Sequence, residues 1–123
     1  MRKTRILGGL IFGGTVALGV SLYAADPHPS PLYREYCAKC HGEDGRGQTP
    51  KGKQLGAKDF TDPEFQADET DAHLIKAVTK GDDEMPAFGK KLTKAQIASL
   101  VKHDVRGFGR KMEGERKKVK GGR

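Results

Sequence analysis

The chain has only two cysteines, and they lie three positions apart in the sequence Cys37-Ala38-Lys39-Cys40-His41. Two thiols at this spacing share one face of a helix, where each can add to a vinyl group of the same porphyrin. The imidazole of the next residue, His41, can then bind the iron from one side. Because C-x-x-C-H is the attachment motif of a c-type haem, the sequence predicts one haem c bound covalently through Cys37 and Cys40.

Three other uses of the two cysteines fit the sequence less well. A thioredoxin-type redox pair normally follows a βαβ pattern, whereas a short segment bounded by proline precedes Cys37. A zinc site needs four ligands, and here the fourth would be His28, His73 or His103, none of which lies at a recognisable ligand spacing. A plain disulfide leaves the adjacent His41 unexplained, so we favour haem.

Length and composition predict one small domain with extensions. The chain has 123 residues, of which 35% are hydrophobic, with 17 Gly and no Trp. So polar a chain builds a thin core, and a large apolar macrocycle would supply much of the missing buried surface. The net charge of +7 is concentrated at the ends: residues 1–25 carry three basic and no acidic residues, 26–105 carry 12 and 14, and 106–123 carry eight and two. The high pI therefore says little about the docking face of the central domain.

Residues 1–25 have the pattern of an export signal, a basic start followed by the uncharged run Ile6–Ala25. A signal peptide has an apolar stretch of ~7–15 residues, but this run is 20 residues long and reaches the length that spans a membrane. We expect residues 1–25 to be either a cleaved signal peptide or an uncleaved N-terminal membrane anchor. In both cases the chain from Asp26 onward is exported, into the periplasm of a bacterium, soluble or anchored to the inner membrane.

Residues 26–31 contain three prolines and predict an extended linker. We predict that residues 32–108 form the haem domain. Its first helix should start at Pro31, after the N-cap Ser30, and end at Gly42. One face of this helix carries the apolar stripe of Tyr33, Tyr36, Cys37 and Cys40. The glycine-rich segment 42–58 is expected to be a loop that runs close to the haem. Its residues expected to face the haem on the histidine side are Pro50 and Leu55.

Three more helical segments are predicted after this loop. A single turn starts at Asp62-Pro63, and a longer helix runs from about Thr70 to Gly81. A final helix starts with the capping box Thr93-Lys94-Ala95-Gln96 and is expected to end at Gly107 or Gly109. Its apolar stripe consists of Ile97, Leu100, Val101, Val105 and Phe108. The fold class predicted from these elements is all-α.

Residues 81–89, between the last two helices, show neither a helical nor a strand period and contain Met85. A thioether is a soft ligand suited to haem iron. Met85 is the only methionine inside the predicted domain, because Met1 lies in the leader and Met112 in the tail. A histidine as sixth ligand and an open, five-coordinate iron are the alternatives. We favour Met85 over the three candidate histidines, His28, His73 and His103.

The order of these features resembles a class I monohaem cytochrome c of the bacterial, exported kind, over roughly residues 30–108. The resemblance rests on the Cys37-x-x-Cys40-His41 motif, the glycine-rich loop, the Met85-Pro86 loop and the final helix from Leu92-Thr93. It implies a small cytochrome c fold, in which three to five short helices wrap around one covalent haem. It also implies that His41 and Met85 are the axial metal ligands.

The same resemblance implies that Tyr33 and Leu100 meet where the first and last helices cross. The sequence departs from the family at two positions. His103 stands where such proteins often place an aromatic residue, and Pro50 lies closer to His41 than the proline that commonly supports the proximal ligand.

Residues 109–123 are basic and glycine-rich and predict a disordered tail. A basic tail can bind nucleic acid, but this one has no aromatic residue to stack on bases. Contact with anionic lipid, or with an acidic partner protein, fits an exported protein better. A solvated tail without any partner is the third alternative.

The sequence as a whole predicts a one-electron carrier of a respiratory-type chain, not an enzyme, because ligation by His41 and Met85 leaves no iron position for a substrate. Its expected partners are redox proteins, with a quinol-oxidising complex or a dehydrogenase as donor and an oxidase or reductase as acceptor. The alternative function is a gas-binding sensor or a peroxidase-like haem protein with an open iron position.

Overall fold

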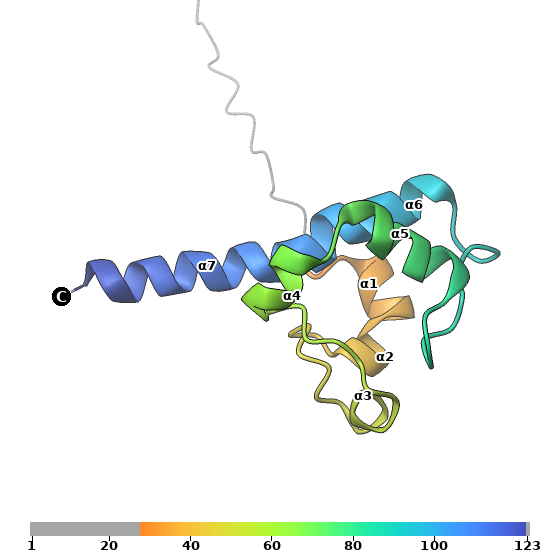
Figure 1. Ribbon diagram of the computed structural model, residues 1–123, viewed down its shortest axis with the longest axis horizontal. Helices are drawn as coiled ribbons and strands as arrows, with labels where there is room; N and C mark the ends of the chain where they lie inside the picture. The colour runs from red at the N-terminus through yellow and green to blue at the C-terminus, as the bar shows by residue number, and fades with distance from the viewer. Residues whose placement is uncertain (1–27, 123) are drawn as a thin grey trace, which may run out of the picture.

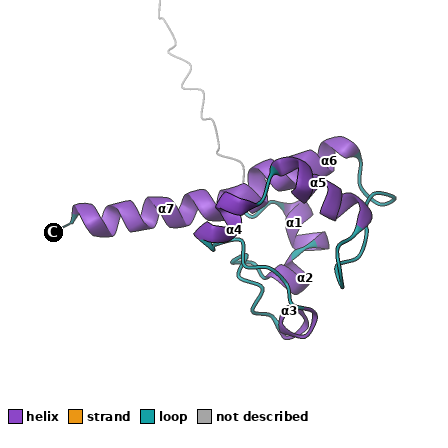
Figure 2. Cartoon of the chain, viewed as in Figure 1, coloured by secondary structure: helices purple, strands orange, loops and turns teal. Residues whose placement is uncertain are grey.

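The computed structural model describes residues 28–122, and the regular elements of this part are all helical (Figures 1 and 2). This confirms the predicted all-α class. The leader predicted for residues 1–25 lies outside the described residues. In the described part, no helix has both the length and the apolar character needed to cross a membrane. The elements in chain order are α1 (Pro31–Tyr36), α2 (Ala38–His41), α3 (Pro50–Leu55), α4 (Pro63–Asp68), α5 (Asp71–Lys80), α6 (Lys94–Ser99), the π-helical segment η1 (Leu100–Val105) and α7 (Arg106–Gly121).

Three of the short helices begin in the same way, with a capping side chain followed by proline. The caps of α1, α3 and α4 accept a hydrogen bond from a backbone N–H in the first turn; they are Ser30, Thr49 and Asp62. Proline suits the next position because its fixed φ is helical and it has no N–H to leave unpaired. The prediction of a loop throughout 42–58 is therefore wrong for α3, which starts at Thr49-Pro50 and ends at Gly56 with a left-handed φ of 67°.

The other predicted helix starts are confirmed. The Thr70 side chain caps α5, and Gly81 is its C-cap. At the start of α6, the Gln96 backbone N–H donates to the Thr93 hydroxyl at 3.1 Å, and the Thr93 N–H donates to the Gln96 side chain at 2.9 Å, which completes the capping box.

The final helical run is longer than predicted, because α6, η1 and α7 follow one another without a loop through Gly121. Gly107 and Gly109 do not end it. A Cβ atom on Gly107 would lie 2.4 Å from the His28 ring, and one on Gly109 would lie 2.6 Å from the Gln66 side chain. These glycines therefore allow neighbouring segments to approach the helix closely.

The prediction of a disordered tail also differs from the structure, which is helical in this segment as far as Gly121. Lys, Arg and Glu are good helix formers, and the Lys117 ammonium lies 2.7 Å from the Glu113 carboxylate one turn away. The basic composition of this segment predicts disorder, whereas the helix propensity of its Lys, Arg and Glu residues favours the helix α7.

The core lies where α1 crosses η1 and the start of α7. Tyr33 has no exposed surface, and its ring packs against Phe108 with 5.3 Å between centroids. Leu100 is 2% exposed and belongs to the same hydrophobic cluster, and its segment η1 packs against α1. A direct contact between Tyr33 and Leu100 stays a prediction. The Tyr33 hydroxyl donates to the Gly42 carbonyl at 2.9 Å, which connects this crossing to the end of α2.

The end of the predicted linker is fixed to η1. The backbone N–H and the hydroxyl of Ser30 donate to the Asp104 carboxylate at 2.7 and 2.8 Å, and Asp104 is only 1% exposed. The His28 Nε2 atom lies 3.1 Å from the Asp104 carbonyl oxygen. Residues 28–30 are thus a packed part of the domain.

Candidate haem site

The two cysteines lie at a break between helices. Cys37 separates α1 from α2 with φ −117° and ψ −39°, and Cys40 lies within α2. Both side chains are half-buried, both thiols are free, and both line the same cavity. Burial, with smaller contributions from nearby Asp104 and Cys40, raises the pKa of the Cys37 thiol to about 12. In the protein without haem, this thiol is therefore neutral at physiological pH.

His41 ends α2 and is held in a fixed orientation. Its side chain is buried, its ring stacks on Phe60 with 4.3 Å between centroids, and its Nδ1 lies 3.1 Å from the Lys58 carbonyl oxygen. Because a carbonyl oxygen can only accept, Nδ1 must carry the proton, and the Nε2 lone pair remains available to a metal. Burial lowers the pKa of His41, although the bond to Lys58 acts in the opposite direction, so the ring is held in the neutral form that binds iron.

The residues around His41 differ in part from those predicted. Leu55 lines the cavity as expected, whereas Pro50 is exposed at the first position of α3 and does not line it. The prediction for Pro50 is therefore wrong. Sequence reasoning missed the roles of Phe60 and the Lys58 carbonyl, since a backbone acceptor leaves no mark in the sequence.

Met85 lies in a tight turn on the other side of the cavity from α2. The N–H of Asp82 donates to the Met85 carbonyl at 3.1 Å, and the N–H of Met85 donates to the Asp82 carbonyl at 2.7 Å. The Met85 side chain is half-buried, packs against the hydrophobic core and lines the cavity together with His41. Met112 is on α7 and does not line the cavity.

None of the three alternative histidines lines this main cavity. The His28 ring packs edge-on against Phe108, with 4.5 Å between centroids. His73 is exposed on α5 and pairs with Glu69, and the Nδ1 atom of His103 lies 3.6 Å from the Asp104 carboxylate. Within residues 28–122, no three His, Cys, Asp or Glu side chains gather in a way that could hold a metal ion.

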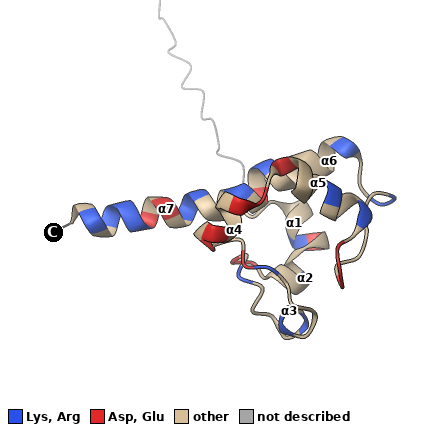
Figure 3. Cartoon of the chain, viewed as in Figure 1, with Lys and Arg blue, Asp and Glu red and all other residues tan. Residues whose placement is uncertain are grey.

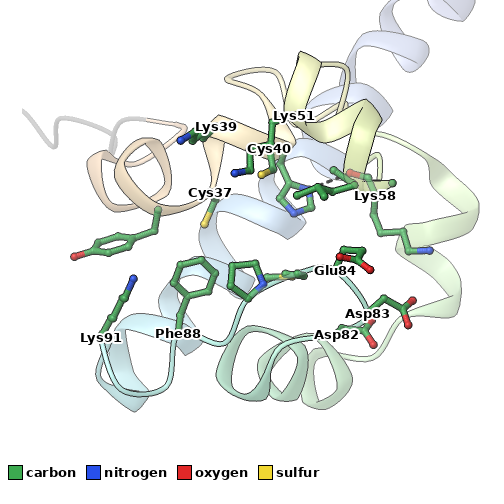
Figure 4. A pocket seen from close by; sticks show the side chains of 17 residues that line it. Cys37, Lys39, Cys40, Lys51, Lys58, Asp82, Asp83, Glu84, Phe88 and Lys91 are labelled. Atoms are coloured by element: carbon green, nitrogen blue, oxygen red, sulfur yellow. Dashed lines mark hydrogen bonds between the residues drawn. The ribbon is translucent and has the colours of Figure 1, made fainter.

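The cavity has a volume of about 530 Å³, within the range of ~300–1,000 Å³ that is usual for ligand sites. Tyr36 and Phe88 add apolar walls. Charged residues surround the mouth: the lysines are Lys39, Lys51, Lys58 and Lys91, and the acidic residues are Asp82, Asp83 and Glu84 (Figure 4). A large apolar cavity bordered by two thiols, a neutral imidazole and a thioether fits a haem c, because these are the groups that attach and ligate it in cytochromes c.

Comparison with known proteins agrees with this geometry. Residues 24–103 match the family described as cytochrome c oxidase, cbb3-type, subunit III. The chain belongs to this family. A solved c-type cytochrome, KustC0563, is 42% identical and superposes with a TM-score of 0.59 over 63% of this chain and 92% of that one. A mutant form of KustC0563 gives 41% identity and a TM-score of 0.58, over 63% and 93%. The chain therefore contains a c-type cytochrome domain.

Two curated relatives are named as oxidase subunits. The cbb3-type cytochrome c oxidase subunit CcoP of Azospirillum brasilense is 35% identical over 79 residues, which cover 63% of this cytochrome and 27% of CcoP. The subunit FixP of Azorhizobium caulinodans is 32% identical over 100 residues, which cover 79% and 29%. This cytochrome thus matches less than a third of the length of either relative.

Proposed function

We propose that this cytochrome is a one-electron carrier that holds a single haem c through thioether bonds to Cys37 and Cys40, with His41 and Met85 as axial ligands. The observation that carries the proposal is that all four side chains line one cavity and that His41 Nδ1 is already bonded to the Lys58 carbonyl. When bound there, haem supplies reversible one-electron exchange at its iron.

The residues of the chain account for the rest of the proposed activity. Lys58 and Phe60 fix the His41 ring, so that it does not have to reorient when the charge of the site changes. The turn that pairs Asp82 with Met85 holds the thioether at the cavity. If His41 and Met85 both hold the haem iron, no iron position would be left for a substrate, which favours a carrier over an enzyme.

We place this carrier in a respiratory chain on the exported side of the membrane, the periplasm of a bacterium. The relatives named as subunits of a cbb3-type oxidase support this place, as does the basic leader followed by the uncharged run Ile6–Ala25. A quinol-oxidising complex or a dehydrogenase would deliver the electron, and an oxidase or reductase would accept it. The leader would be cleaved or would remain as an anchor in the inner membrane.

Carbon monoxide binding to the reduced protein tests the ligation and the function together. The unaltered protein should not bind the gas rapidly, whereas Met85→Ala should bind it and show a lower midpoint potential, because a methionine ligand raises the potential. Met112→Ala is the matched control, since this methionine lies on α7 away from the cavity, and it should leave both measurements unchanged. Rapid binding by the unaltered protein would instead support the gas sensor or peroxidase-like alternative.

A further inference from the structure

Most of α7 projects away from the domain (Figure 1). Its first two turns contact the domain, since Phe108 is 3% exposed and the Met112 sulfur lies 4.0 Å from the Arg46 guanidinium. After Met112 every described residue of the helix is exposed, including Val119 at 73%, the one large hydrophobic side chain that residues 28–122 leave exposed. At ~1.5 Å per residue, α7 is about 24 Å long. Its outer part adds nothing to the core.

The projecting segment carries the excess positive charge of the described residues (Figure 3). Residues 28–109 contain 13 Lys and Arg and 13 Asp and Glu, which balance, whereas residues 110–120 contain six basic and two acidic residues. Only one carboxylate in this segment, that of Glu113, is paired in the structure, with Lys117. A net charge of +4 on an arm of eleven residues is complementary to an extended anionic surface.

The arrangement of charge around the helix suits a flat surface. At about 100° per residue, Lys111 and Lys118 lie on one side of Val119, and Arg116 and Lys120 lie on the other. One carboxylate, that of Glu115, shares this face. Cations on both sides of one apolar residue can reach the headgroups of an anionic bilayer when this face of the helix lies against it.

The start of α7 packs against His28, which follows the uncharged run of the leader closely in the sequence. His28 packs against Gly107 and Phe108, and only three chain steps separate it from Ala25, the last residue of that run. Three extended residues span at most about 10 Å. No residue of α7 lines the haem cavity. An α7 in contact with a membrane would therefore leave the cavity accessible to a redox partner.

We propose that residues 110–120 of α7 form a membrane-docking arm that binds the headgroups of anionic phospholipid through Lys111, Arg116, Lys118 and Lys120. The proposal rests on the exported, membrane-side location proposed above. The arm would hold the domain against the bilayer beside the end of the leader. Each cation near an anionic bilayer changes the binding constant about fivefold, and the attraction weakens with salt because the Debye length is only ~8 Å at physiological ionic strength.

Hydrogen exchange of the full chain with nanodiscs tests this arm directly, without depending on haem chemistry or on a redox partner. The haem-loaded protein is mixed with discs of phosphatidylcholine alone or with about 30% phosphatidylglycerol, an anionic lipid. We expect the amides of residues 110–120 to exchange at least tenfold more slowly with the anionic discs, and this protection to disappear in about 0.5 M salt. Equal exchange with both discs at low salt would overturn the proposal and leave an acidic protein surface as the counterpart of the arm.

Two matched variants distinguish an effect of the cations on the arm from an effect of the total charge of the protein. Replacing Lys111, Arg116, Lys118 and Lys120 with Gln should abolish the protection by anionic discs. Replacing four exposed lysines of the domain that do not line the cavity, Lys53, Lys76, Lys90 and Lys94, removes the same charge and should preserve it. An unchanged haem spectrum shows that each variant is folded. Equal loss of protection in both variants would contradict a specific role of the arm.

Discussion

The helix crossing and the cavity wall of this domain hold their side chains in place by different means. At the helix crossing, five large side chains are at most 3% exposed; they are Tyr33, Ile97, Leu100, Val101 and Phe108. In the cavity wall, the half-buried side chains of Cys37, Cys40, Met85 and Phe88 face a volume of about 530 Å³. Protein interiors contain few voids larger than a water molecule, so the wall needs a ligand to complete its packing, whereas the crossing is already complete.

The helix crossing is therefore held by contacts among the protein's own side chains, whereas the cavity wall depends on a bound cofactor. Direct contacts, such as the Tyr33–Phe108 pair, fix the crossing. The backbone around the cavity is fixed at a few points, among them the Thr49 hydroxyl, which donates to the carbonyls of Lys39 and Cys40 at 2.8 and 2.9 Å. We therefore expect changes in the wall to affect haem content and changes in the crossing to affect stability.

Loss of both cysteines should have the largest effect of all the changes, because it removes the haem attachment and leaves the cavity wall without its ligand. The double variant Cys37→Ser, Cys40→Ser should lose all covalent haem, because no other thiol exists in the chain, and haem staining on a denaturing gel checks this. Without the macrocycle to fill the cavity, tryptic cleavage in residues 42–58 should increase before cleavage in α5. Covalent haem in the double variant would refute the proposed attachment.

Phe108→Ala should be the most destabilising single change at the helix crossing. Truncating a buried phenylalanine costs about 3–5 kcal/mol of unfolding free energy, and Phe108 contacts His28 and Tyr33, with 4.5 and 5.3 Å between ring centroids. Chemical denaturation measures the loss, and the haem spectrum of the folded variant should not change.

Phe88→Ala is the control on the cavity wall. Phe88 is only half-buried, so its truncation should cost less than that of Phe108 and should alter the haem spectrum instead. If the two variants lost equal stability with unchanged spectra, the distinction between crossing and wall would fail.

The same distinction explains what the sequence could predict. The sequence predicts Cys37, Cys40 and His41 as haem residues from a specific motif, and Met85 because it is the one methionine inside the predicted domain. The structure brings these side chains to one cavity, and their roles toward haem stay a prediction. The 3.6-residue period predicts the apolar stripe of the final helix, and the resemblance to cytochromes c implies that this helix crosses the first one. Both regions are encoded by residue type and spacing.

Features that depend on backbone or context were missed. The Lys58 carbonyl that orients His41 has no sequence signature. Glycine often caps helices, so the sequence predicts a helix end at Gly107 or Gly109. In the structure Gly107 instead makes room for His28, which lies 79 positions away in the sequence. The helix α3 was hidden among glycines, although Thr49-Pro50 has the same start pattern as Ser30-Pro31.

Arg106→Lys should have an intermediate effect on stability. It tests whether the helix crossing also depends on the contacts of Arg106 with α4 and α5. The Arg106 guanidinium donates to the Asp71 carboxylate at 2.7 Å, to the carbonyl and side chain of Gln66 at 2.9 and 3.1 Å, and to the Glu69 carbonyl. A lysine cannot reproduce this planar set of donors, and the loss should be about 1.5–3 kcal/mol. Chemical denaturation measures it.

Arg110→Lys is the matched control for this change. Arg110 is exposed and makes one long bond, of 3.2 Å, to the Lys102 carbonyl. Its replacement should change stability by less than about 0.5 kcal/mol, as is usual for surface positions. A similar loss in both variants would mean that the contacts of Arg106 do not join α4 and α5 to the final helix.

The smallest expected effect concerns the outer half of α7, which has neither the packing of the crossing nor a cofactor. The Lys117 ammonium donates a hydrogen bond to the Glu113 carboxylate, and its positive charge lies close to it. Both effects lower the pKa of Glu113 below its ordinary value of 4.5. A lowered pKa means that the pair supports the helix fully above the ordinary pKa and that this support is lost as the pH falls through the lowered value. Cα chemical shifts of residues 113–121 should therefore report less helix in acid, and Glu113→Gln should reduce helicity at neutral pH. Glu115→Gln, at a carboxylate without an ion pair in the structure, should reduce helicity less. An equal loss of helicity in both variants would show that the Glu113–Lys117 pair does not support α7.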